Sequence, residues 1–118
     1  MKVTIYQKPS CSTCREVYAS LVKAGVDVDA VNYYVEPLSA AQIRSLLKKM
    51  GLTARDILRK KGRAYEELGL AEQDIPDGEL IALMVKHPDL LQRPIVEAGD
   101  RAILARPASR ILEFLSGA

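Results

Sequence analysis

The strongest constraint on the fold is a cysteine pair set between a strand-like and a helix-like segment. The sequence CSTC holds both cysteines of the chain, Cys11 and Cys14. Residues 2–7 (KVTIYQ) before it are β-branched and alternate, which predicts a strand. After the turn-like KPSC, apolar residues recur at helical spacing and stop at a glycine, which predicts a helix over residues 12–25. The pair therefore lies at the start of the first helix.

The order of the later segments predicts the rest of the topology. Residues 26–35 alternate again, so the first 35 residues predict a β-α-β unit with parallel strands. A helix is predicted to start after Ser39, its candidate N-cap, because Gln42 three residues later has the spacing of a capping box. The helical pattern continues to Gly62. Two more helical segments follow, AYEELGL and then PDGELIALMVKHP, the second ended by a proline.

The C-terminal part predicts a hairpin and a last helix. PIVEAGDRAILA predicts two short strands around Ala98–Gly99–Asp100. The last helix is expected to place Ile111, Leu112 and Leu115 on one apolar face. The order β-α-β, helical insertion, β-β-α is the thioredoxin-like plan, an α/β fold with a mixed sheet. With 118 residues, we expect a single domain, 1–118, with the insertion at about 39–88.

A reactive cysteine is favoured by this position. A helix N-terminus presents unpaired N–H groups and about half a positive charge, and both stabilise a thiolate over a thiol. Cys11 is expected at or just before the N-cap, and Arg15 adds a positive charge nearby. Cys14 lies one turn further in, where it is shielded and can attack a bond formed at Cys11.

Two other interpretations of the cysteines are weighed against this one. A closed structural zinc site needs four ligands, whereas the chain offers its two cysteines and His87, so no metal is expected. An inert buried pair is compatible with the spacing, but the strand-turn-helix context disfavours it.

Composition limits the partners and the compartment. The formal charge of +2 is too balanced to indicate nucleic acid or an anionic membrane as the partner. No apolar run approaches the roughly 18 residues of a membrane span, and the N-terminus has no export-signal pattern. We therefore expect a cytoplasmic monomer, in a compartment where paired cysteines serve metal binding or redox chemistry.

Five segments in register resemble one known family over nearly the whole chain. They are PSCSTCR, ILRKK, YEELGL, LIALMVKHPDLLQRPIV and ARPASRILEFL. Together they strongly resemble the glutaredoxin-coupled arsenate reductases of the ArsC/Spx family, which have a thioredoxin-like fold and act in arsenical resistance.

The resemblance implies a set of site residues. Cys11 matches the nucleophile that attacks arsenate, and Pro94 matches a cis-proline beside it. The arginines that hold the oxyanion match Arg59, Arg93 and Arg106. Guanidinium groups suit this role because they bind oxyanions in a forked geometry and keep their charge. The neighbouring stretch RDILRKKGR is so basic that only the match selects Arg59.

Two departures from the family pattern bear on mechanism. The best-known members have a serine where this chain has Cys14, and they depend on glutathione and glutaredoxin. Here Cys14 is expected to resolve the reaction as a Cys11–Cys14 disulfide, which favours thioredoxin as the electron donor. The family often has a histidine four residues before the nucleophile, where this chain has Gln7.

Two alternative functions stay open. An Spx-like regulator uses CxxC as a redox switch and binds RNA polymerase. A thiol-disulfide oxidoreductase acting on another substrate needs the cysteines without the arginines. The presence of Arg59, Arg93 and Arg106 in one chain favours the arsenate reductase.

Overall fold

The computed structural model describes residues 2–117, and the chain divides into two compact units. The first unit joins the segment up to Glu36 with the segment from Arg93 onward. The second unit is Pro37–Gln92, and it contains the segment for which the sequence predicts the helical insertion. That the units form one domain stays a prediction. No helix within residues 2–117 is long and apolar enough to cross a membrane.

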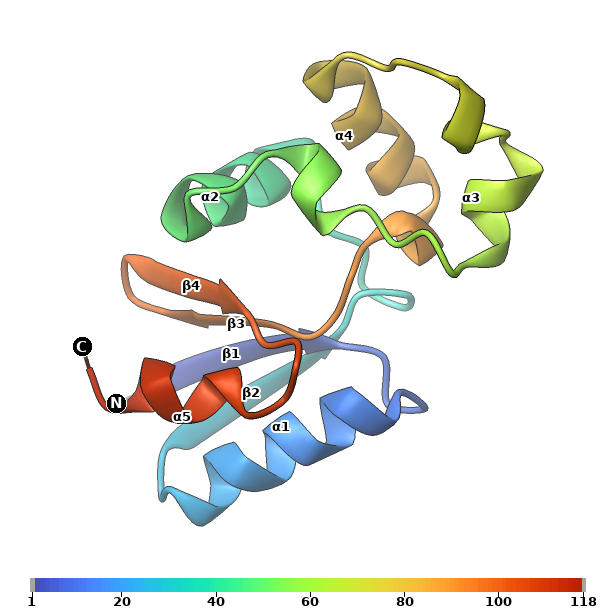
Figure 1. Ribbon diagram of the computed structural model, residues 1–118. Helices are drawn as coiled ribbons and strands as arrows, with labels where there is room; N and C mark the ends of the chain where they lie inside the picture. The colour runs from blue at the N-terminus through green and yellow to red at the C-terminus, as the bar shows by residue number, and fades with distance from the viewer. Residues whose placement is uncertain (1, 118) are drawn as a thin grey trace. The chain divides into compact units, whose positions relative to one another are not determined.

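The first unit is a four-stranded mixed sheet with helices (Figure 1). Its elements are β1 (Lys2–Gln7), α1 (Ser12–Lys23), β2 (Asp27–Asn32), β3 (Ile95–Ala98), β4 (Arg101–Leu104) and α5 (Arg110–Leu115). The strand order is β2-β1-β3-β4; β2 runs parallel to β1, and β3 and β4 pair antiparallel. The predicted β-α-β unit, the hairpin and the mixed sheet are confirmed.

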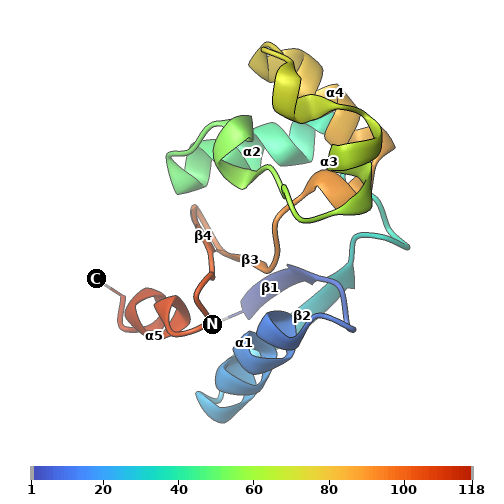
Figure 2. The ribbon, with the colours of Figure 1, turned by 45° about the vertical axis from the view of Figure 1, so that its right-hand side comes forward.

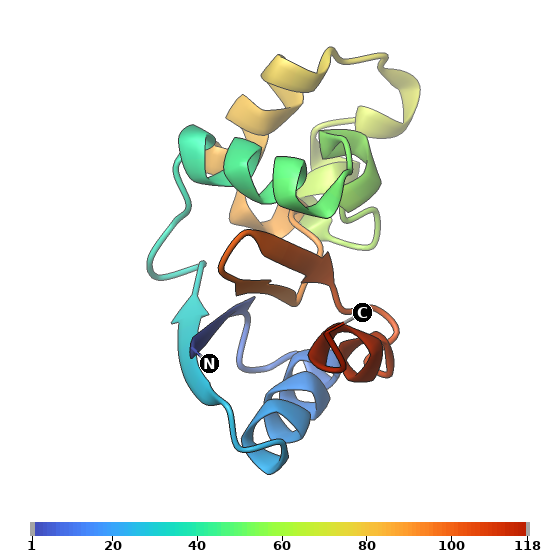
Figure 3. The same cartoon turned by 90° about the vertical axis from the view of Figure 1, so that its left-hand side faces the viewer.

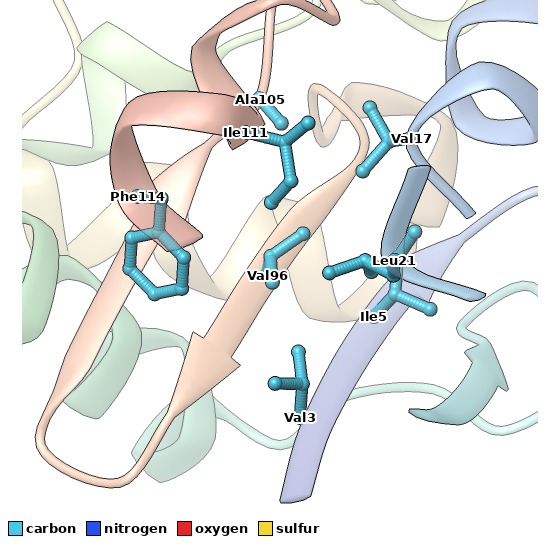
Figure 4. Close-up of a cluster of buried hydrophobic side chains, with 8 residues drawn as sticks. All are labelled: Val3, Ile5, Val17, Leu21, Val96, Ala105, Ile111 and Phe114. Carbon is cyan, nitrogen blue, oxygen red and sulfur yellow. The ribbon is translucent and has the colours of Figure 1, made fainter. Parts of the chain in front are cut away.

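The core of this unit lies between the sheet and its two helices. α1 and α5 contact each other and cover the same face of the sheet (Figures 1 and 3). Val3 and Ile5 point to that face because side chains two apart in a strand share a side. Figure 4 shows the buried cluster, made of Val3, Ile5, Val17, Leu21, Val96, Ala105, Ile111 and Phe114. This packing fixes α1, and therefore its N-terminus, against the end of β1.

The second strand is shorter than predicted. The sequence predicts a strand over residues 26–35, but β2 ends at Asn32. The Asn32 side-chain oxygen accepts a hydrogen bond from the Tyr34 backbone N–H at 3.0 Å, and its carbonyl accepts from Val35 and Glu36. An asparagine that folds back on the next residues makes a turn and ends the ladder. Tyr33 and Tyr34 consequently lie in a turn.

The predicted apolar face of the last helix is partly wrong, and α1 buries a cysteine in addition to apolar residues. Leu112 is 62% exposed, whereas Phe114 packs with Ile111 in the core. In α1, Val22 is exposed, and Cys14 joins Val17 and Leu21 as the buried face. In a short helix, the spacing of apolar residues predicts the buried face only to within about one residue, because neighbouring apolar residues can each occupy it.

The second unit is helical (Figure 2). Its α-helices are α2 (Ala40–Met50), α3 (Arg63–Glu67) and α4 (Asp77–Lys86), and α2 contacts α4. The predicted capping box at α2 is confirmed: the Ser39 hydroxyl accepts from the Gln42 N–H at 3.1 Å, and the Gln42 side chain accepts from the Ser39 N–H at 2.9 Å.

The helical character predicted up to Gly62 is wrong. Only Ala54–Ile57 forms a short 3-10 turn, and Leu58 is extended and bridges to Leu91. Arg59 N–H donates to the Leu90 carbonyl at 2.7 Å, so this backbone pairs with a distant segment. Such long-range hydrogen bonds override the local helical spacing.

Removing the side chain of Leu21 tests the core. Leu21→Ala is expected to lower the free energy of unfolding by about 2–5 kcal/mol, because the side chain is fully buried and its loss leaves a cavity. The matched control, Leu112→Ala, makes the same change at an exposed helical site and is expected to cost under about 0.5 kcal/mol. Urea denaturation of both variants measures the difference, and equal losses would contradict the assigned core.

Candidate active site

The first helix begins at Cys11, which serves as its N-cap. After β1 the chain turns, and the Cys11 N–H donates to the Lys8 carbonyl at 2.9 Å. Cys11 has extended backbone angles, and its Sγ accepts a hydrogen bond from the Cys14 N–H at 3.4 Å. The sulfur thus takes the place that a serine or aspartate oxygen usually has at a helix start, next to N–H groups without intrahelical partners.

The surroundings of Cys11 favour its thiolate. Partial burial opposes ionisation, but hydrogen bonds from the Cys14 N–H and the Cys14 thiol outweigh it, together with a hydrogen bond and the positive charge from Arg93. The net effect lowers the pKa of Cys11 to about 7. A substantial fraction of Cys11 is therefore ionised at neutral pH.

Cys14 has the opposite environment. Its side chain is fully buried, and burial is the largest reason why its pKa is raised to about 12. The Lys8 backbone N–H and the Arg93 charge favour its ionisation, whereas the hydrogen bond to Cys11 and the Cys11 charge oppose it. Both cysteines are free thiols in this structure. One turn of helix thus holds an ionised sulfur beside a protonated one.

Arg93 supplies the charge beside Cys11 from a buried position. It is 7% exposed, and its peptide bond to Pro94 is cis. Nη1 donates a hydrogen bond to the Tyr34 hydroxyl at 3.0 Å, and the guanidinium also hydrogen-bonds to Tyr33 and Cys11. All these partners belong to the first unit, so Arg93, Pro94 and both predicted cysteines come together there.

Arg106 is linked to the same segment. Its Nη1 donates to the Arg93 carbonyl oxygen at 2.9 Å, and its own bond to Pro107 is also cis. Neither Arg93 nor Arg106 forms a salt bridge with any residue from 2 to 117. Two guanidinium groups in this unit therefore keep a positive charge that no described carboxylate balances.

Arg15 is placed differently from the sequence expectation. Its side chain is exposed, and Nη1 donates to the Pro9 carbonyl at 3.3 Å. The charge that lowers the pKa of Cys11 is that of Arg93. Arg15 contributes to this turn by bracing Pro9.

Arg59 lies in the second unit, where a carboxylate holds it. Its Nη1 is 3.0 Å from Asp89 Oδ1, and Asp89 Oδ2 accepts from the Ala64 N–H at 3.2 Å. A Cβ at Gly62 would collide with the Asp89 carboxylate and lie 2.6 Å from Arg59 Nη1, so a larger residue there would displace this ion pair. Its role as a third oxyanion ligand stays a prediction.

Sequence reasoning missed Lys8, Tyr33 and Tyr34. The Lys8 ammonium lies 4.6 Å from the centre of the Tyr34 ring, and Tyr33 is almost fully buried beside it. Burial raises the pKa of Tyr33 well above its usual value, which keeps its hydroxyl protonated. The available signal was the tyrosine pair itself, which follows a strand end where functional side chains gather.

Gln7 occupies the position where a histidine was expected from the family pattern. Its Oε1 is buried and has no hydrogen-bond partner among the described residues. An amide side chain does not titrate, so it cannot take a proton from Cys11. The ionisation of Cys11 rests instead on the helix start and Arg93.

No group of three or more histidine, cysteine, aspartate or glutamate side chains within residues 2–117 is arranged to hold a metal ion. The arrangement in the first unit is that of a nucleophilic thiolate, a second thiol within hydrogen-bond reach, and guanidinium groups without carboxylate partners. This combination can attack an electrophilic centre that carries anionic oxygens, and the two sulfurs can afterwards form a disulfide.

Comparison with known proteins identifies relatives over nearly the full length. The family model described as "ArsC family" matches residues 6–114. An arsenate reductase of Rhizobium meliloti is 38% identical over 98% of this chain and 82% of its own length. The protein YfgD of Escherichia coli, described as uncharacterized, is 40% identical over 97% of each chain.

Solved structures agree with this family and fold. The arsenate reductase from Vibrio cholerae superposes with a TM-score of 0.89 and 35% identity, covering 96% of this chain and 97% of that one. The thioredoxin-like α/β fold predicted from the element order is confirmed.

The two cysteines are expected to differ in how their rate of alkylation depends on pH. Iodoacetamide should alkylate Cys11 with a half-maximal rate near pH 7, because its pKa is about 7 and only the thiolate reacts. Below that pH the rate should fall roughly tenfold per pH unit. Peptide mass spectrometry assigns the alkylated residue, and Cys14, with a pKa of about 12, should stay unmodified. A Cys11 midpoint above pH 8.5 would contradict the site as described.

Proposed function

Because the chain belongs to the ArsC family, we propose that it reduces arsenate to arsenite, with Cys11 as the nucleophile. The observation that carries the proposal is the low pKa of Cys11 beside Arg93, a guanidinium that pairs with no carboxylate among residues 2–117. A thiolate needs an electrophile, and an unbalanced positive charge next to it selects one that carries negative oxygens. The arsenate reductases among the relatives point to arsenate as that oxyanion.

Arg93 and Arg106 bind the oxyanion in this proposal, with Arg59 as the third guanidinium. Arsenate is largely a dianion at neutral pH, and forked N–H donors match its oxygens. The N–H groups at the start of α1 add further donors, as helix N-termini do for other oxyanions. Arg93, Arg106 and the start of α1 belong to the same unit, and donors that are held in position before substrate arrives stabilise the charge that develops during displacement.

The first step is attack of the Cys11 thiolate on arsenic. An S–As(V) bond forms and one As–OH bond breaks; the hydroxyl takes a proton from solvent, equal to the one that Cys11 released on ionising, and leaves as water. The arginines neutralise the remaining oxygens, so the negative charge of the arsenate does not repel the incoming thiolate. The oxidation states of arsenic and sulfur do not change in this step.

The second step uses Cys14. Its sulfur attacks the Cys11 sulfur, an S–S bond forms, and the S–As bond breaks with its electron pair remaining on arsenic. Arsenic leaves as As(III) in arsenite, and the thiol proton of Cys14 passes to an arsenite oxygen. Once Cys11 is bound to arsenic its negative charge is gone, which removes one of the causes that keep Cys14 protonated. The order of the two attacks thus follows from the two pKa values.

The third step returns the Cys11–Cys14 disulfide to thiols. A dithiol redoxin of the thioredoxin class supplies the two electrons by disulfide exchange. Glutathione with glutaredoxin is the second donor system, and it acts by displacing arsenic from the Cys11 adduct in place of Cys14.

Conservative arginine substitutions test the oxyanion site. Arg93→Lys and Arg106→Lys should each lower kcat/KM for arsenate by about 10- to 100-fold, since charge-assisted hydrogen bonds contribute about 1.5–3 kcal/mol each. Arg59→Lys should act in the same direction. Arsenite production is measured with purified chain, glutathione and both redoxins. Arg44→Lys, on the exposed side of α2, is the matched control and should leave kcat/KM unchanged.

Absence of arsenite above the no-enzyme rate in this assay would overturn the proposed substrate. If the Cys11–Cys14 disulfide still forms and is still reduced by a redoxin, the chain is instead a thiol-disulfide oxidoreductase acting on another substrate.

Replacing Cys14 with serine separates the two donor systems. Cys14→Ser should abolish turnover supported by thioredoxin, because no internal disulfide can form. Turnover with glutathione and glutaredoxin should persist, since an external thiol then displaces arsenic. Steady-state assays with each donor system alone measure the split. Unchanged turnover with thioredoxin would remove the resolving role of Cys14.

A further inference from the structure

Tyr34 is held firmly in the turn that follows β2. Its backbone N–H donates to the Asn32 side chain at 3.0 Å, and its ring packs on Tyr33 with a centroid distance of 5.1 Å. The turn and the buried Tyr33 ring therefore fix the direction of the Tyr34 hydroxyl.

That hydroxyl accepts a hydrogen bond from Arg93 Nη1 at 3.0 Å. A buried guanidinium needs acceptors for its N–H groups, and the usual acceptor is a carboxylate. Arg59 in the second unit has such a partner, Asp89. A carboxylate on Arg93 would cancel the charge that acts on Cys11, whereas a neutral phenol oxygen satisfies an N–H group and leaves that charge in place.

Tyr34 also engages a second cation. The Lys8 ammonium lies 4.6 Å from the ring centroid, and the Arg93 Cζ lies 5.9 Å from it. The negative face of an aromatic ring attracts cations, so the ring offsets part of the repulsion between two positive side chains in one site. One uncharged side chain thereby contacts two cations, and one of them, Arg93, acts on Cys11.

We propose that Tyr34 is a positioning residue, which aims the Arg93 guanidinium at Cys11 and at the bound oxyanion while leaving its charge unbalanced. The part concerning the oxyanion rests on the proposed function, whereas the part concerning Cys11 does not. Tyr34 itself takes no part in bond making.

Tyr34→Phe tests this role because it removes the acceptor and keeps the ring. The half-maximal pH for alkylation of Cys11 should rise by about half a unit or more, since Arg93 then turns away from the thiolate. KM for arsenate should rise about three- to tenfold, with a smaller change in kcat. Tyr18→Phe, on α1 and 39% exposed, makes the same chemical change and should alter neither quantity.

The other charged or titratable groups around Cys11 and Arg93 stay the same in this variant. They are Lys8 after β1, Cys14 and Arg15 in α1, Tyr33 after β2 and Arg106 after β4. A shift of the Cys11 midpoint therefore reports the loss of the Tyr34 hydroxyl, and the double-mutant cycle below assigns that shift to Arg93.

A double-mutant cycle decides whether Tyr34 acts through Arg93. In the Arg93→Lys background, Tyr34→Phe should have no further effect on the Cys11 midpoint. An equal shift in both backgrounds overturns the proposal, as does an unchanged midpoint in the single variant, even if the melting temperature falls. The alkylation assay contains no arsenate. It therefore tests the role of Tyr34 even if arsenate proves not to be the substrate.

Discussion

The hydrogen bond from the Cys14 N–H to the Cys11 sulfur is the interaction on which the site depends. It makes Cys11, the proposed nucleophile, the N-cap of α1, so the Cys11 sulfur is part of the helix start. The bond requires α1 to begin at Ser12. Val17 and Leu21 pack in the core against the sheet, and this packing holds α1 in that position. Packing several residues away therefore sets the chemistry of Cys11.

The two cysteines in the same helical turn have different environments. Cys11 is partly exposed and accepts hydrogen bonds that favour its ionised form, whereas Cys14 is enclosed in the core, where burial favours its protonated form. The two sulfurs are coupled, because the charge on the first helps to keep the second protonated. Loss of that charge, when Cys11 forms a bond, lowers the barrier to ionising Cys14. The difference in burial thus contributes to Cys11 ionising at a lower pH than Cys14.

Positive charge in the first unit is kept available by the choice of partners. Arg93 donates to tyrosine oxygens and to sulfur, and Arg106 donates to a backbone carbonyl. These acceptors satisfy guanidinium N–H groups without neutralising them. Arg59 in the second unit follows the commoner pattern, with Asp89 as its counter-ion. Among residues 2–117 no carboxylate pairs with Arg93 or Arg106, so both guanidinium charges stay available, as the proposed binding of an oxyanion requires.

The sequence by itself determined the element order, the first strand and helix, the capping box at Ser39 and the place of Cys11 at a helix start. These features depend on local spacing and on residue types with strong backbone preferences, so they can be recognised without knowing the contacts. The resemblance to a family then selected Arg59, Arg93 and Arg106 among many basic residues, and their role in binding an oxyanion stays a prediction.

Tertiary structure alone decided the features that depend on long-range contacts. The backbone near Leu58 is extended because it pairs with Leu91, a distant residue, and the core chose Phe114 over Leu112. Tyr34, which accepts a hydrogen bond from Arg93, lies 59 residues away in sequence, in the turn by which Asn32 ends β2. Hydrogen-bond partners and burial are properties of the folded chain, and they set the pKa of Cys11. The sequence therefore identifies Cys11 as the proposed nucleophile, and the fold supplies the charge that lowers its pKa.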